Sequence, residues 1–218
     1  MNKEWSELNK TMQAQIKKKD TYKMGIDTLF NLRRQLMQTL VSFKEDLCRE
    51  DFNAIPFINA DGYHSKTIAY SIWHIFRIED IVAHTVITED EQVFFTGNYQ
   101  VRINSPIITT GNELVKQQIA DLSKQLNLEE LYSYIFEVRE STEKILERFS
   151  YDELKWKIPD ERKGYLKSLN VVNCDEKAIW LIDYWCSKDI RGLIQMPFSR
   201  HWIMHTEACL RIKNKMHS

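Results

Sequence analysis

The stretch P-F-S-R-H-W-I-M-H-T-E-A-C-L, residues 197–210, decides how we interpret the rest of the chain. Pro197 can occupy the first turn of a helix without losing a needed donor, and Ser199 can cap the free backbone amides, so the stretch predicts the start of a helix. His201 and His205 are then one turn apart on the same face, about 5–6 Å apart at Cβ. At this spacing two imidazoles can bind one metal ion.

A third ligand would have to come from another helix, and His74 in S-I-W-H-I-F-R-I-E-D is the best candidate. Residues 66–88 predict a helix whose inward face includes His74, whereas His84 falls roughly 80° further round, outside that face. Burying an imidazole on an apolar face costs on the order of a few kcal/mol unless its nitrogens find partners. Three inward histidines therefore favour a shared metal ion over three separate hydrogen-bonded core residues.

The bulk composition indicates one domain of ordinary charge. The 218 residues carry 30 Lys and Arg against 31 Asp and Glu, so no broad attraction to nucleic acid or to an anionic membrane is expected. The four cysteines are scattered without a C-x-x-C motif, no apolar leader is present, and no apolar run approaches the roughly 20 residues of a membrane span. We expect a cytoplasmic protein with reduced thiols.

The apolar periodicity predicts an all-α fold, which the six Gly and four Pro also favour. Residues 1–20 are expected to be a loosely attached helical extension, and residues 21–218 a single helical domain. The main helices are expected at residues 26–48, 66–88, 129–149 and 198–215, with a short aromatic helix at 177–187. The connection 89–126 is expected to hold a short extended piece and then a helix from 112, and 151–175 to be a second long connection.

Three imidazoles with an open position are typical of a catalytic metal site, in which a bound water or thiol becomes a better nucleophile, and Zn or Ni suits these ligands. A zincin-type protease is excluded because no Glu follows His201. A di-iron site is excluded because no His has Glu three residues before it.

Other side chains receive weaker interpretations. Asp183, Glu79 and Glu207 could accept a hydrogen bond from a ligand imidazole, although we expect each to be a charge on a helix surface. We expect His64 and His217 to be exposed, and Cys186 and Cys209 to be small buried hydrophobes. Four aromatic residues could wall a pocket beside the metal or simply belong to the core: Tyr184, Trp185, Trp202 and Phe198.

The chain resembles the DinB/YfiT-like metalloenzyme superfamily in two motifs. They are W-H-I-F-R-I-E-D on a second helix and, far downstream, H-x-x-x-H on the final helix after a Pro-containing turn. The resemblance covers roughly residues 27–88, 128–149 and 178–213. It implies a four-helix bundle of up-down-down-up type, often a homodimer, with a divalent metal held by His74, His201 and His205. The N-terminal extension and the two long connections exceed what a minimal member needs.

The resemblance also implies a reaction class. Characterised members are S-transferases or thiol-dependent isomerases that use a low-molecular-weight thiol, so thiol transfer to a small electrophile is the leading hypothesis and metal-assisted hydrolysis the next. Neither the substrate nor a catalytic residue beyond the three ligands is indicated. The alternative is a non-catalytic helical bundle, whose histidines bind metal for stability or bind none, that acts as a structural or protein-interaction module.

Overall fold

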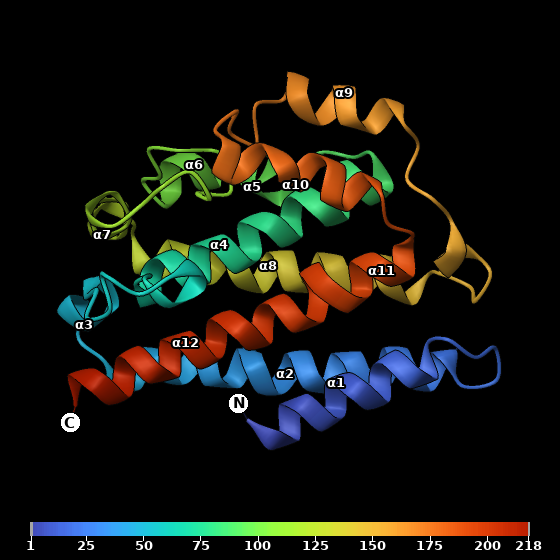
Figure 1. Cartoon of the computed structure of the whole chain (residues 1–218), viewed down its shortest axis with the longest axis horizontal. Coiled ribbons are helices and arrows are strands. Elements are labelled where there is room, and N and C mark those ends of the chain that lie inside the picture. Colours follow the sequence, from blue (N-terminus) through green and yellow to red (C-terminus); the bar gives the residue numbers. More distant parts are fainter. Residues whose placement is uncertain (1, 218) are drawn as a thin grey trace.

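The computed structural model describes residues 2–217. Helices make up the regular structure of this part of the chain, and its one β-type pairing is the isolated bridge between Lys157 and Asp189 (Figure 1). The all-α prediction is therefore confirmed. None of the described helices combines the length and apolar character that crossing a membrane would require.

Four long helices enclose a shared core. They are α2 (Tyr22–Asp46), α4 (Ile68–Asp80), α8 (Leu128–Glu147) and α12 (His201–Met216). Helix α4 contacts both α8 and α12, and α2 contacts the same two helices. All of α4 is buried, so Figure 1 shows it in the middle of the molecule. It continues as the π-helical segment η2 (Ile81–Thr88).

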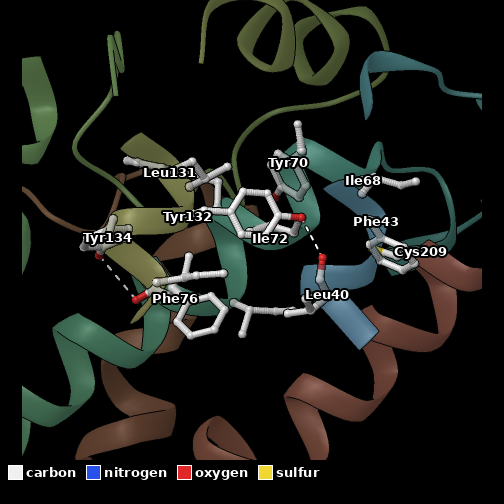
Figure 2. Packing of buried hydrophobic residues seen from close by; sticks show 14 of the residues in the cluster. Leu40, Phe43, Ile68, Tyr70, Ile72, Phe76, Leu131, Tyr132, Tyr134 and Cys209 are labelled. Atoms are coloured by element: carbon white, nitrogen blue, oxygen red, sulfur yellow. Dashed lines mark hydrogen bonds between the residues drawn. The ribbon is translucent and has the colours of Figure 1, made fainter. Parts of the chain in front are cut away.

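Tyrosine side chains fasten the core by satisfying buried backbone groups. Tyr132 donates its hydroxyl proton to the carbonyl of Leu40 over 2.6 Å, which joins α8 to α2 (Figure 2). Tyr134 bonds to the carbonyl of Phe76 at 3.4 Å and to the Asp80 carboxylate at 2.9 Å, which joins α8 to α4. These bonds fix the position of α8 against α2 and α4, because a buried polar group without a partner is costly.

Helix α1 (Lys3–Gln15) packs closely along α2. Trp5, Met12 and Ile16 are all buried, so the N-terminal residues are not the loose extension that we expected. Gly25 makes the approach possible, because a Cβ atom there would lie 2.5 Å from the Ile16 side chain.

The connection at residues 89–126 contains α5 (Val93–Thr96), α6 (Tyr99–Arg102) and α7 (Gln117–Gln125), and the predicted extended piece is wrong. The buried Asp80 carboxylate explains the difference. Its oxygens accept hydrogen bonds at 2.9 Å from the backbone amides of Val93 and Phe94, so the first amides of α5 are satisfied without a strand partner.

The remaining elements are short. They are α3 (Arg49–Asn53), η1 (Gly62–His64), η3 (Glu153–Lys155), α9 (Glu161–Ser168), α10 (Glu176–Cys186), α11 (Ile190–Gln195) and the π-helical segment η4 (Met196–Arg200). The predicted aromatic helix corresponds to α10, which contacts η2.

The last long helix does not start at Pro197 as the sequence predicted. The chain is already helical in α11 and passes through the wider turn of η4 before α12 begins. Ser199 caps nothing, because its hydroxyl donates to the carbonyl of Ile194 at 2.9 Å. A π-helical turn accommodates Pro197, which has no N–H to give to a regular helix.

Candidate metal centre

His74 from α4 meets His201 and His205 from α12 at one buried point. One ring nitrogen from each of the three lies within 4.8 Å of the other two. The side chains are only 4%, 7% and 4% exposed, in that order. The Nε2 atoms of His74 and His201 are 3.2 Å apart. The structure thus brings together the three histidines that the sequence singled out.

A hydrogen bond defines which nitrogen of His74 faces the centre. His74 Nδ1 lies 2.7 Å from the backbone carbonyl of Thr110, and a carbonyl can only accept, so Nδ1 carries the proton. His74 Nε2 then has a free lone pair, and it points at His201. The Nδ1 atoms of His201 and His205 are buried without a hydrogen-bond partner. Orphaned buried nitrogens of this kind require an explanation.

Burial keeps all three imidazoles neutral. Desolvation lowers the pKa of His74 to about 4, although the bond to Thr110 opposes this and Lys66 adds to it. Desolvation lowers the pKa of His201 and His205 well below the usual value, and the neighbouring histidines lower both further. Neutral imidazole is the form that binds metal ions, so the site is ready to do so at neutral pH.

The donor set fits a zinc-type ion. Two nitrogens about 2.0–2.1 Å from a tetrahedral zinc ion lie about 3.4 Å apart, close to the 3.2 Å between the His74 and His201 Nε2 atoms. Among residues 2–217 no Cys, Asp or Glu joins the three histidines. The group therefore offers three nitrogen ligands and leaves a coordination position for another molecule.

The carboxylates proposed as acceptors for the ligand histidines have other partners. Asp183 pairs with Lys163, and Glu207 accepts from the backbone amide of Asn2. Thr110, which does hold His74, was not identified from the sequence. A backbone carbonyl in a connecting loop has no side-chain pattern that could reveal it.

Glu79 is fully buried rather than on the surface. It accepts bonds from the Arg33 guanidinium at 2.7 and 2.9 Å and from the Trp202 indole at 2.7 Å. Arg33 also lies over the Trp202 ring, 4.4 Å from its centroid. Since Trp202 follows His201 in α12, this network fixes the ligand helix against α2 and α4.

Two cavities meet at the histidines. The aromatic cavity, of about 300 Å³, is lined by His74, Ile78, Asn112, Trp180, Leu181, Tyr184, Trp185, Met196, Pro197, His201, Met204 and His205. The polar cavity, of about 340 Å³, is lined by Gly62, Tyr63, Ser65, Lys66, Tyr70, His74, Asn112, Leu114, Val115, Lys177 and His205. Both reach the surface, because Trp180 and Val115 are exposed.

Only some of the predicted pocket residues line these cavities. Tyr184 and Trp185 wall the aromatic cavity, as the sequence suggested. Trp202 and Phe198 are fully buried core residues instead. Trp202 contacts Phe76 with ring centroids 4.5 Å apart.

The other candidate residues stay outside the metal centre. His64 is partly buried against Tyr63 rather than fully exposed, with ring centroids 4.0 Å apart, and burial lowers its pKa. His217 is exposed as expected, 3.6 Å from Asp51. Cys209 is buried as expected, which raises the pKa of its thiol to about 12. Cys186 is buried as well.

His84 is buried, contrary to the position that the helical wheel gave it. Its Nδ1 lies 2.6 Å from Asp90 and its Nε2 3.0 Å from the hydroxyl of Ser141. This arrangement has the connectivity of a serine hydrolase triad. However, Ser141 lies in the middle of α8, whose backbone amides are used within the helix, and none of the cavities described here includes it. The three side chains are better explained as a link between η2 and α8.

A comparison with protein-family models gives no match, and a comparison with curated proteins gives none either. The interpretation of the site therefore rests on its own geometry: three buried neutral imidazoles, unpartnered nitrogens and two cavities that meet at them.

Proposed function

We propose that this chain is a DinB-like metalloenzyme. His74, His201 and His205 would hold one divalent ion, Zn or Ni, and the long helices α2, α4, α8 and α12 would form the up-down-down-up bundle of that superfamily. The observation that supports the proposal best is the meeting of three buried neutral imidazoles, two of them with an unpartnered Nδ1, at the boundary of two open cavities.

The bound ion would supply a nucleophile by lowering the pKa of a thiol or a water molecule. The residues of the chain orient the ligands and bind the substrate. The Thr110 carbonyl fixes the orientation of His74, and its bond to Nδ1 directs the Nε2 lone pair to the centre. The apolar walls of the aromatic cavity exclude water and accept a small electrophile, so thiol transfer is the favoured reaction and hydrolysis the second.

The alternative is a metal site that only stabilises the bundle or supports a protein partner. A structural zinc site is normally closed by a fourth protein ligand, whereas a catalytic site keeps a position open. No fourth His, Cys, Asp or Glu side chain joins the three histidines within residues 2–217, and two cavities reach them. These observations favour the enzyme.

The first test is the metal content of protein purified without an affinity tag, measured by elemental analysis. We expect about one Zn or Ni ion per chain in the wild type and far less in His74→Ala and His205→Ala. His217→Ala is the matched control, because His217 lies outside the site, and it should keep its metal. The circular dichroism of all variants should stay helical, because the hydrophobic core that holds the long helices together does not include these histidines.

Full metal content in the alanine variants would show that the ligand assignment is wrong. No stoichiometric metal in the wild type, even after Zn or Ni is added back, would refute the metalloenzyme. Metal-loaded protein is then assayed for thiol transfer from small thiols to 1-chloro-2,4-dinitrobenzene and for ester hydrolysis. Metal binding without turnover in either assay would favour the structural alternative.

A further inference from the structure

The polar cavity is positively charged. Its lining includes the side chains of Lys66 and Lys177 and contains no Asp or Glu. A cation in the three-histidine site would add to this charge. A cavity with this balance attracts anions, since uncompensated charge in a partly dry site is costly.

Lys66 has no ion-pair partner within residues 2–217. Its ammonium group is partly buried and lies 5.1 Å from the centroid of the Tyr70 ring, against which it packs. Lys177 differs, because it is half exposed and has Asp175 at 3.7 Å. Lys66 is therefore the main positive group inside the cavity, and Lys177 lies at its rim.

The charge of Lys66 acts on the metal centre itself. Lys66, His74 and His205 line the same cavity, and the positive charge of Lys66 lowers the pKa of both histidines. Burial lowers the pKa of Lys66 as well. Glu113 is the acidic residue of the adjacent loop, but it bonds to Thr109 and does not line the cavity.

The aromatic cavity has the opposite character. Apart from the histidines, Asn112 and the Tyr184 hydroxyl, its lining is apolar, with Trp180, Trp185 and two methionines. Asn112, His74 and His205 line both cavities, so an elongated molecule can occupy both and pass beside the three-histidine site.

We propose that Lys66, with Lys177 at the rim, is the carboxylate-binding subsite of an amphipathic acid substrate whose apolar group enters the aromatic cavity. This deepens the proposed function, since the two subsites flank the position where the reaction would occur. A carboxylate suits the cavity better than a phosphate. One inner ammonium matches a single negative charge, and no arginine lines the cavity to bind a phosphate in a bidentate way.

The test measures the binding of 4-phenylbutanoate and of its uncharged analogue 4-phenylbutanamide by isothermal titration calorimetry. The full-length protein is used as purified and after removal of metal by a chelator. We expect the acid to bind wild type about tenfold more tightly than the amide in both forms. Lys66→Met should remove this preference, and Lys66→Arg should keep most of it. Lys18→Met, at an exposed lysine in the turn between α1 and α2, should change nothing.

A second variant tests the apolar subsite. Trp180→Ala should weaken the acid and the amide equally, because it removes apolar contact without changing charge. Thermal unfolding of each variant confirms that it folds, which we expect because Lys66 and Trp180 are both partly exposed.

Three outcomes would overturn the subsite. They are equal binding of the acid and the amide to wild type, no binding of either, and an unchanged preference for the acid in Lys66→Met. A preference seen only with metal present and retained in Lys66→Met would assign the carboxylate to the metal instead. Since the decisive measurement is made without metal, a protein that failed to load Zn or Ni would refute the metalloenzyme and leave this result intact.

Discussion

Lowering the pH from 7 to 5 should destabilise the metal-free protein through its three buried histidines. In the unfolded chain a histidine binds its proton with a pKa near 6.5. Burial lowers the pKa of His74 in the folded state to about 4. Between these values the unfolded state binds more protons than the folded state, so the free energy of unfolding decreases as the pH falls.

The size of the effect follows from these two pKa values. At pH 5 the unfolded His74 is almost fully protonated and the folded one almost neutral, which costs about 2 kcal/mol of stability, rising to about 3 kcal/mol by pH 4. His201 and His205 change stability in the same direction, because burial lowers the pKa of both. Burial raises the pKa of Asp80, which acts in the opposite direction but equally in wild type and variants.

The measurement is urea unfolding, followed by circular dichroism in the presence of a chelator, on wild type and His74→Asn at pH 7 and pH 5. The asparagine amide can replace Nδ1 as donor to the Thr110 carbonyl, but it does not titrate. His74→Asn should therefore lose about 2 kcal/mol less stability than wild type between the two pH values. His217→Asn, at the exposed histidine, should behave as wild type. Equal losses in wild type and His74→Asn would refute the assignment of a neutral buried imidazole.

Glu79→Gln should lower the free energy of unfolding by about 3 kcal/mol, because it leaves the buried Arg33 charge without its main partner. Urea unfolding measures this loss, and a loss below about 1 kcal/mol would contradict the prediction. Gly111→Ala should weaken Zn affinity about tenfold in a chelator competition. Gly111 has φ +75°, so an alanine there would strain the backbone and displace the neighbouring Thr110 carbonyl. Unchanged affinity would show that this carbonyl does not position His74. Gly25→Ala should lower stability by about 1–3 kcal/mol in thermal unfolding by forcing α1 from α2, and an unchanged melting temperature would mean that α1 is not held there.

The sequence predicted best the features that depend on helical periodicity. The buried leucines of α2 recur every three or four residues, so both the helix and its inward face follow from the pattern. His201 and His205 lie on one face for the same reason. His74 could be placed on an inward face, but its meeting with the other two depends on how α4 crosses α12, which no local pattern encodes.

The wheel failed for His84 because α4 and η2 have no outer face there. A helical wheel assigns an outward position by assuming solvent on one side, yet the whole of α4 is buried, and other elements cover the side on which His84 lies. The same limit applies to Ser199. Its type suits a helix cap, but the preceding residues are helical already, so the hydroxyl turns back to the carbonyl of Ile194.

Segments outside the long helices supply the charged and aromatic groups of the two cavities. Asn112 and the Thr110 carbonyl come from the connection between η2 and α8, Lys66 from the segment before α4, and Trp180 from the short helix α10. Helices α4 and α12 supply the three imidazoles, while the connecting segments supply charge on one side and aromatic surface on the other. Substrate choice should therefore change when these segments are exchanged, whereas metal binding should persist as long as the Thr110 carbonyl still holds His74.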